Sequence, residues 1–277
     1  MVFPATPPYG DTLTGSWKAP DDFCYKFPAT MTLQEGALCE PLTVGVHIAR
    51  QVGIKPGDSV VVMEAGPIGL LCAAVAKTFG TSIVCSVDIV ESKLEFAKDF
   101  CATHTYLSQK VNACENAEKI LKLIGLPDGA DIASVYVVCN GGAYLRSGMG
   151  KADVNFPIMA LCCKEVTAYG SFRYGASDWK IAVELVADKK VKVKKLVSEI
   201  VEFKDTNKAF NKVKEGQAIK ILIAGPNEKN VVKQTLCRGL SKERINEKTK
   251  RNALESRRSG VRSRGLMMVE NGHGIDQ

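Results

Sequence analysis

The chain has 277 residues, of which 45% are hydrophobic and 24% charged, the composition of an ordinary globular protein with one large or two small domains. No apolar run reaches the ~18–20 residues of a membrane-spanning helix, and the start lacks the basic and apolar segments of a secretory signal. The formal net charge of +7 lies in residues 229–277, where 12 Lys or Arg residues stand against five Asp or Glu residues. That stretch has no aromatic residue for stacking on bases, so we expect a solvated or disordered tail in preference to a nucleic-acid arm.

The first segments predict irregular structure and then a helix. Residues 9–31 combine turn residues, aromatics and prolines, which predicts loops with short strands. Thr32 is a candidate N-cap for the helical stretch that follows, and Pro41 is expected to interrupt or restart that helix.

From residue 59 onward, apolar strands and helices alternate. Strands are predicted at 59–63, 82–88 and 104–108, and helices at 66–80, 91–100 and 115–126. Continuous apolar strands that alternate with helices are typical of a parallel sheet covered on both faces. Because parallel crossovers are right-handed, we predict an α/β fold with a Rossmann-like, doubly wound parallel sheet.

The alternation is interrupted after residue 131. One short apolar run ends at Val138 and another begins at Ala143, whereas a complete parallel crossover needs ~10–12 connecting residues or more. These two runs cannot be a parallel pair joined by a helix, so we expect an internal deletion near 131–138. The pattern then resumes with strands at 164–172, 195–203 and 218–224 and helices at 177–190 and 204–216.

A glycine-spaced turn joins the strand at 59–63 to the helix after it. Gly66 and Gly69 take the second and third places of G-x-G-x-x-G, where the backbone approaches a pyrophosphate and the helix packs closely on the strand. Pro67 suits the helix start, whose free N–H groups and dipole favour phosphate. Glu64 replaces the first glycine, so we expect a strained turn, repulsion of phosphate and reduced affinity.

Asp88 ends the second strand, where a dinucleotide site has an acidic residue for the ribose hydroxyls. Its carboxylate would repel a 2′-phosphate, which favours NAD over NADP. A Rossmann-like domain that binds no nucleotide is the alternative that Glu64 leaves open.

Ten cysteines are scattered along the chain, and none forms a C-x-x-C pair. Several, such as Cys72, Cys85 and Cys101, stand among core-like residues. We expect reduced, mostly buried thiols in a cytoplasmic protein.

Longer segments carry a more specific resemblance, among them "CEPLTVGVHIARQ", "VDIVESKLEFAK", "GMGKADVNFPIMA" and "KEVTAYGSFRYG". Over roughly residues 1–228 the chain resembles the polyol branch of the zinc-dependent medium-chain dehydrogenases, and within it the fungal xylitol dehydrogenases (D-xylulose reductases). The resemblance implies NAD-dependent oxidation of a polyol to a ketose, xylitol to D-xylulose, by zinc-assisted hydride transfer. It also implies a small-molecule substrate, no membrane partner and a possible homo-oligomer.

The resemblance assigns roles to residues of this chain. Glu40 matches a glutamate near the metal, and Arg173 and Tyr174 match substrate contacts. The matches to cofactor contacts are Gly66, Pro67, Ile68, Gly69, Asp88, Lys93, Ser147, Gly148, Met149, Phe172 and Arg173.

The resemblance also implies an N-terminally truncated member, because the family's chain begins well before Met1 and carries most zinc ligands there. A catalytic zinc needs three protein ligands, of which Glu40 is the one offered here. His47, His104 and His273 have no ligand partner at useful spacing, so we expect them to be structural or solvated. A zinc-free reductase and a non-catalytic NAD(H)-binding remnant therefore stay open.

The resemblance divides the chain into four parts. The expected domains are a remnant of the GroES-like catalytic domain at 1–50, the NAD-binding Rossmann domain at 51–170, a C-terminal part of both at 171–228, and the basic tail at 229–277.

Overall fold

The structure is a computed structural model that describes residues 13–19, 21, 24–148, 153–226 and 228, and the backbone of 267–269. These residues fall in two compact units. One is Tyr25–Leu196, and the other is made of the described parts of Met1–Cys24 and Val197–Asn271. Met149, His273 and most of the basic tail lie outside the described residues. No described helix combines the length and apolar character needed to cross a membrane.

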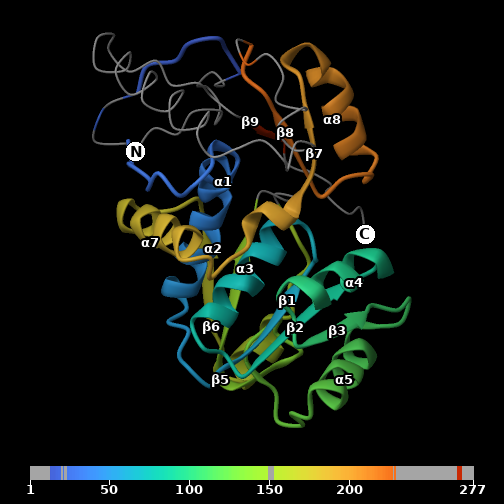
Figure 1. The fold of residues 1–277 in the computed structure, drawn as a ribbon. Coiled ribbons are helices and arrows are strands. Elements are labelled where there is room, and N and C mark those ends of the chain that lie inside the picture. Colours follow the sequence, from blue (N-terminus) through green and yellow to red (C-terminus); the bar gives the residue numbers. More distant parts are fainter. Residues whose placement is uncertain are drawn as a thin grey trace. The chain divides into compact units, whose positions relative to one another are not determined.

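The unit Tyr25–Leu196 contains a six-stranded sheet in the order β3-β2-β1-β4-β5-β6, with every neighbouring pair parallel (Figure 1). The strands are β1 (Ser59–Met63), β2 (Ile83–Asp88), β3 (His104–Leu107), β4 (Ala130–Ile132), β5 (Val138–Ser147) and β6 (Thr167–Ser171). The chain runs outward from β1 to β3 and then crosses to β4 on the other side of β1. This order confirms the predicted doubly wound fold and places its switch point beside β1, where such sheets bind ligands.

Helices cover both faces of this sheet. They are α1 (Leu33–Ala37), α2 (Cys39–Gln51), α3 (Pro67–Thr78), α4 (Glu91–Phe100), α5 (Ala113–Ile124), α6 (Ile158–Cys163) and α7 (Ala176–Ala187), with the short 3-10 helix η2 (Val193–Leu196) after them. Val61 and Cys85 share a core cluster with Ile120 of α5. Since side chains alternate along a strand, the buried Val60 and Val84 point to the opposite face, where α3 packs on β1 and β2 (Figure 1). Helix α6 was missed because its six residues are too few to show a period.

The first helices begin where the sequence predicts. Thr32 caps α1, with its hydroxyl accepting from the Glu35 N–H and the Glu35 carboxylate accepting from the Thr32 N–H. The helix ends at Ala37 and α2 begins at Cys39, so Pro41 stands in a first turn, where its missing N–H has no helical partner to lose. The short strands expected within 9–31 are wrong for the described residues of that range, which hold none.

The connection between β4 and β5 is much shorter than a normal parallel crossover. Residues 133–137 contain no helix, and the Ala130 N–H donates directly to the Val137 carbonyl. A Cβ on Gly129, whose φ is +111°, would lie 2.4 Å from the Cys139 nitrogen, so this turn requires glycine. Val138 and Ala143 belong to one strand, β5. The prediction that no helix joins the two apolar runs is confirmed, but the prediction that the runs are separate segments was wrong. The internal deletion stays a prediction.

The second unit holds a three-stranded sheet in the order β7-β8-β9. Its elements are β7 (Val197–Val201), the 3-10 helix η3 (Phe203–Asp205), α8 (Thr206–Lys214), β8 (Lys220–Ile223) and β9 (Met267–Val269). Ala209 and Val213 of α8 pack on Ile221 and Ile223. Strand β9 pairs antiparallel with β8 and satisfies backbone groups along its edge. The prediction of a wholly solvated or disordered tail is therefore wrong for these three residues. The rest of 229–277 lies outside the described part.

Candidate functional site

The carboxyl ends of the parallel strands meet at one edge of the sheet, and the predicted cofactor contacts follow them. Glu64 comes directly after β1, Asp88 ends β2, Ser147 ends β5 and Phe172 follows β6. Ser147 pairs in register with Ser171, the last residue of β6. The topology therefore gathers residues from four strands at the edge where doubly wound sheets bind dinucleotides.

The turn after β1 has the backbone shape of a phosphate-binding loop. Glu64 has a φ of +73°, which confirms the predicted strain, and its N–H donates to the Val87 carbonyl at 2.7 Å. A Cβ on Gly69 would stand 1.9 Å from the Glu64 carbonyl oxygen, so α3 approaches β1 as closely as the third glycine allows. At Gly66 a Cβ would meet no atom within 4 Å. The protein's own packing does not require glycine there.

Helix α3 begins at this turn. Gly66 is its N-cap and Pro67 its first residue, and the first helical bond runs from the Leu70 N–H to the Gly66 carbonyl. The N–H groups of Ile68 and Gly69 lie in the first turn, so they have no carbonyl partner within the helix. Together with the positive end of the helix dipole, they can bind an anion.

Asp88 joins the turn to the start of α4. Its side chain is buried, with Oδ2 accepting from the Ala65 N–H at 2.8 Å and Oδ1 accepting from the Val90 N–H at 2.9 Å. The Lys93 Nζ lies 3.8 Å from Oδ2. Each carboxylate oxygen can accept a second hydrogen bond, so the carboxylate can still bind ribose hydroxyls.

At the other end of this edge, Arg173 brings Glu40 into the site. The Arg173 Nη1 lies 3.6 Å from Glu40 Oε1, although the two residues come from the segment after β6 and from the first turn of α2. The φ of Arg173 is +57°, and its guanidinium carbon lies 6.0 Å from the centre of the exposed Phe172 ring. Tyr174 packs edge-on against Trp179. Gly148, with a φ of +93°, continues β5, and Met149 lies outside the described residues.

The comparisons with known proteins agree with this geometry. Residues 67–188 match the family described as zinc-binding dehydrogenase. Over 237 residues the chain is 50% identical to the probable D-xylulose reductase A of Aspergillus terreus, covering 81% of this chain and 67% of that protein. The chain belongs to the zinc-binding dehydrogenase family. This confirms the membership that the sequence motifs predicted.

Other relatives of this zinc-binding dehydrogenase show the same extent of match. D-xylulose reductase A of Aspergillus niger is 50% identical, and the match covers 81% of this chain and 66% of that protein. The chain thus spans about two thirds of the length of these relatives. Among solved structures, an Escherichia coli oxidoreductase of unknown specificity has a TM-score of 0.72 at 27% identity. The match covers 79% of this chain and 65% of the E. coli chain. L-idonate 5-dehydrogenase of E. coli has a TM-score of 0.64 at 27% identity, covering 72% and 59%.

The described residues of this zinc-binding dehydrogenase do not fit a catalytic zinc. Glu40, which the resemblance predicts to lie near the metal, is 3.6 Å from the guanidinium of Arg173. No group of three or more His, Cys, Asp or Glu residues in the described part is placed to hold a metal ion. His47 contacts Asp178 at 2.8 Å and His104 contacts Thr103 at 2.9 Å, so both have the structural partners expected of them. With one of three ligands present, no step through zinc follows from these residues.

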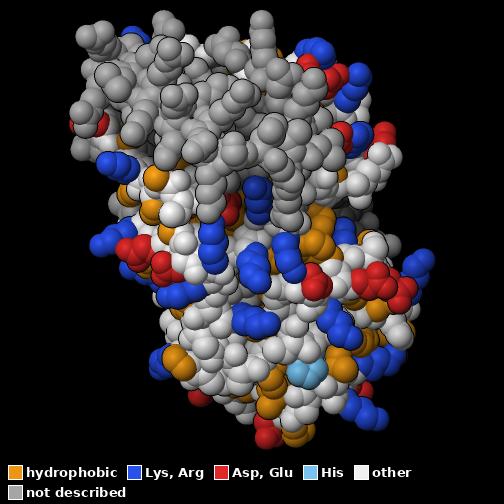
Figure 2. All heavy atoms as spheres, in the orientation of Figure 1, with side chains coloured by type: hydrophobic (Ala, Val, Ile, Leu, Met, Phe, Trp, Pro, Cys, Tyr) orange, Lys and Arg blue, Asp and Glu red, His pale blue; other side chains and the backbone are white. Residues whose placement is uncertain are grey.

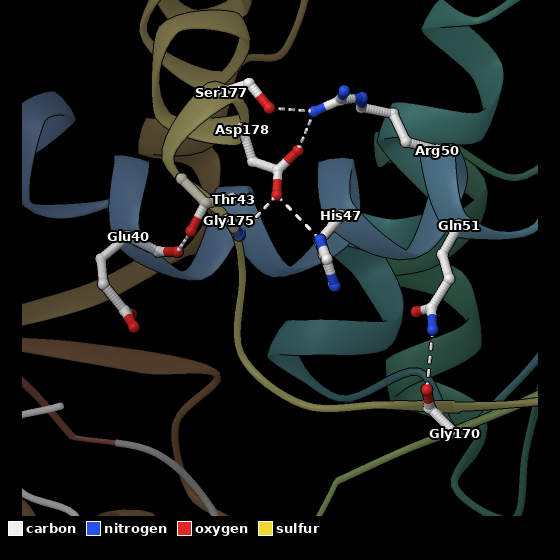
Figure 3. Close-up of polar contacts among 9 residues, drawn as sticks. All are labelled: Glu40, Thr43, His47, Arg50, Gln51, Gly170, Gly175, Ser177 and Asp178. Carbon is white, nitrogen blue, oxygen red and sulfur yellow. Dashed lines mark hydrogen bonds and ion pairs between the residues drawn. The ribbon is translucent and has the colours of Figure 1, made fainter. Parts of the chain in front are cut away.

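A polar network joins α2 and α7 and was not predicted from the sequence (Figure 3). The buried Asp178 contacts His47, Arg50 and the backbone of Gly175. In the view of Figure 3 the Glu40 carboxylate points away from this network. The local signal was the spacing of Gly175 and Asp178, which is that of a helix N-cap and its N3 residue. The partners on α2 gave no signal, because they lie far away in the sequence.

The cysteines divide into buried and exposed groups. Burial raises the pKa of Cys39, Cys72, Cys85 and Cys101 to about 12, since a thiolate is poorly solvated there. The prediction of mostly buried thiols was wrong for Cys24, Cys114, Cys162 and Cys163, which are exposed. All nine cysteines of the described part are free thiols.

The described surface carries charges of both signs, as Figure 2 shows. Exposed ion pairs such as Lys195 with Asp99 and Lys212 with Glu199 join many of them. Such pairs contribute little to stability, because water screens them. The mixed surface agrees with the even balance of basic and acidic residues outside the tail.

Proposed function

We propose that this chain binds NAD(H) at the carboxyl edge of its six-stranded sheet. The observation that carries the proposal is the 2.8 Å hydrogen bond from the Ala65 N–H to Asp88 Oδ2. This bond connects the glycine turn, whose amides can bind a pyrophosphate, with the Asp88 carboxylate, which can bind ribose. The open space beside Gly66 supports the proposal, because the chain itself leaves that space unfilled.

The proposed order of the dinucleotide along the edge follows the order of the strands. The pyrophosphate lies against the N–H groups of Ile68 and Gly69, beside Gly66 and Pro67. The adenosine ribose lies on the β2 side, at Asp88 and Lys93, where the carboxylate disfavours a 2′-phosphate. The nicotinamide half extends toward β5 and β6, where the proposed contacts are Ser147, Gly148, Met149, Phe172 and Arg173.

For the activity we propose that of the D-xylulose reductases, oxidation of xylitol to D-xylulose. NAD+, when bound, accepts the hydride from the carbinol carbon, and the hydroxyl proton leaves to solvent. Arg173 and Tyr174 offer a guanidinium and a phenol that suit a polyhydroxyl chain. No step through zinc can be derived from the described residues, so this activity is proposed from membership of the family. We also propose a cytoplasmic location and, by family, a homo-oligomer.

A second candidate is a non-catalytic NAD(H)-binding protein. It is favoured by the pairing of Glu40 with Arg173 and by the lack of three metal ligands among the described residues. A zinc-free reductase of the same fold is a third reading, to which the polyol-type motif around Arg173 gives less support.

Two measurements on the same preparation separate these functions. NADH fluorescence is titrated with protein, and xylitol-dependent reduction of NAD is followed with and without added zinc. We expect enhanced NADH fluorescence; binding without turnover would establish the non-catalytic NAD(H)-binding protein. Turnover that needs zinc would establish the polyol dehydrogenase, and turnover without zinc would establish the zinc-free reductase. Absence of NADH binding by folded protein would contradict the proposal itself.

A further inference from the structure

Asp178, near the start of α7, is a fully buried carboxylate with three polar contacts. Its side chain is 1% exposed. Oδ2 accepts from the Gly175 N–H at 2.7 Å and lies 2.8 Å from His47 Nδ1. Oδ1 accepts from Arg50 Nη1 at 2.5 Å, and the same nitrogen donates to the Ser177 hydroxyl at 2.6 Å (Figure 3). Removing such a buried acceptor leaves several donors unsatisfied.

These contacts fix one end of the segment Phe172–Tyr174, and α2 also fixes the other end. On the amino side of the segment, the Gln51 amide donates to the Gly170 carbonyl at 2.8 Å (Figure 3). On the carboxyl side, Gly175 is held by Asp178, which is itself held by His47 and Arg50 of α2. The segment is thus attached to one helix on both sides, directly at Gly170, two residues before Phe172, and through Asp178 at Gly175, the residue after Tyr174.

The segment needs such support because its middle residue is strained. Arg173 has a φ of +57°, a left-handed conformation that is unfavourable for a residue with a side chain. Its guanidinium reaches Glu40, which stands on the same helix α2. Strained residues persist where their surroundings determine their conformation.

We propose that Asp178 is a positioning residue that holds Phe172–Tyr174 in the conformation that receives the nicotinamide half of the cofactor. This rests on the proposed NAD(H) site. The segment follows β6, whereas the glycine turn and Asp88 follow β1 and β2 on the other side of the switch point. Loosening it weakens contacts to the nicotinamide and leaves those to the adenosine and pyrophosphate unchanged.

The test compares two ligands on matched variants. NADH contains the nicotinamide, and ADP-ribose has the same adenosine and pyrophosphate without it. The variant Asp178→Asn removes the charge that binds α2. Asp131→Asn is the control. Like Asp178, Asp131 accepts a hydrogen bond from a backbone N–H, in this case that of Ser59, whose hydroxyl also donates to it. Ser59 begins β1, so this contact lies at the edge of the sheet opposite to the proposed cofactor site. Affinities are measured by calorimetry on protein whose thermal unfolding shows it to be folded.

A spectroscopic signal reports the segment directly. Tyr174 lies edge-on to the Trp179 ring at 5.5 Å, and Trp179 follows Asp178 in α7. The chain has two tryptophans, so a Trp17→Phe background leaves Trp179 as the sole indole emitter. We expect its emission to change in Asp178→Asn and to stay the same in Asp131→Asn.

For Asp178→Asn we expect NADH affinity to fall about tenfold and ADP-ribose affinity to stay within about twofold. Equal weakening of both ligands, or no weakening of either, would overturn the positioning role. If the natural chain binds neither ligand, the proposed NAD(H) site itself fails. Should Asp178→Asn not fold, Arg50→Leu decides the matter with the same comparison, because it removes from a half-exposed side chain only the contacts to Asp178 and to the Ser177 hydroxyl.

Discussion

The carbonyl oxygen of Glu64 and the Cα of Gly69 approach so closely that a Cβ at residue 69 would lie 1.9 Å from that oxygen. No real Cβ makes such a contact, so any side chain at this position forces β1 and α3 apart. Gly66, three residues earlier, faces open space. The two glycines of this turn therefore serve different purposes. Gly69 allows the helix to pack closely on the strand, and Gly66 leaves open space beside the backbone.

This contrast predicts opposite results for two alanine substitutions. Gly69→Ala should destabilise the fold by about 3 kcal/mol, because overpacked backbone must move. Gly66→Ala should leave stability nearly unchanged, since its φ of −77° suits alanine, but weaken NADH binding about tenfold or more by filling the space that a phosphate approaches. Urea denaturation and NADH titration check both. Normal NADH affinity in a folded Gly66→Ala variant would argue against the pyrophosphate position.

Glu64 combines backbone strain with a negative charge at the turn. Glu64→Gly should stabilise the fold by about 1 kcal/mol, because glycine adopts a φ of +73° without the penalty of a side chain. It should also strengthen NADH binding. Glu64→Gln separates the two effects, since it keeps the strain and removes the charge. If charge repulsion operates, salt strengthens NADH binding to the natural chain and does not do so for Glu64→Gln. An identical salt response of both proteins would rule out repulsion.

Asp88 supports both the turn and the proposed ribose site. Asp88→Ala leaves the N–H groups of Ala65 and Val90 without their acceptor, so we expect a loss of about 2 kcal/mol or more in unfolding free energy. Asp88→Asn retains one acceptor oxygen and should be milder. It should also raise the affinity for NADPH relative to NADH, because the charge that repels a 2′-phosphate is gone. An unchanged ratio of the two affinities would remove Asp88 from the ribose site.

The buried thiols predict how stability depends on pH. Cys39, Cys72, Cys85 and Cys101 have folded-state pKa values of about 12, above the ordinary value of 9.0. Below pH 9 these thiols are protonated in both states, so their stabilising contribution is complete. Above pH 9 the unfolded thiols ionise first, and stability falls by up to ~1.4 kcal/mol per thiol per pH unit until the folded thiols also ionise.

Labelling identifies these thiols individually. At pH 8 a maleimide should modify Cys24, Cys114, Cys162 and Cys163 in the folded protein and leave the buried Cys39, Cys85 and Cys101 unmodified until denaturant is added. Peptide mass mapping reads this out. Rapid labelling of Cys85 in native protein would show that the core cluster around β2 opens more easily than its burial implies.

Much of the fold was visible in the sequence because its signals are local. The apolar run of β1, the Thr32 cap and the position of Asp88 at a strand end need no knowledge of distant residues. The strain at Glu64 was also predictable, since a side chain stood where the turn called for glycine. These features were confirmed wherever the structure describes them.

What the sequence did not show depends on contacts between distant residues. The β4–β5 link has only five residues, and its pairing is set by close packing around Gly129 and Gly142. His47 has the structural role expected of it, but its partner Asp178 lies 131 positions away in the sequence. No single-sequence pattern reports which buried polar groups will meet.

Calorimetric titration of the folded chain with NADH shows whether the cofactor binds at all. We predict saturable uptake of one NADH per chain, weaker than in a turn with glycine at position 64 and strengthened by Glu64→Gly. No detectable uptake of NADH at millimolar concentration, by either the natural chain or the folded Glu64→Gly variant, would contradict it.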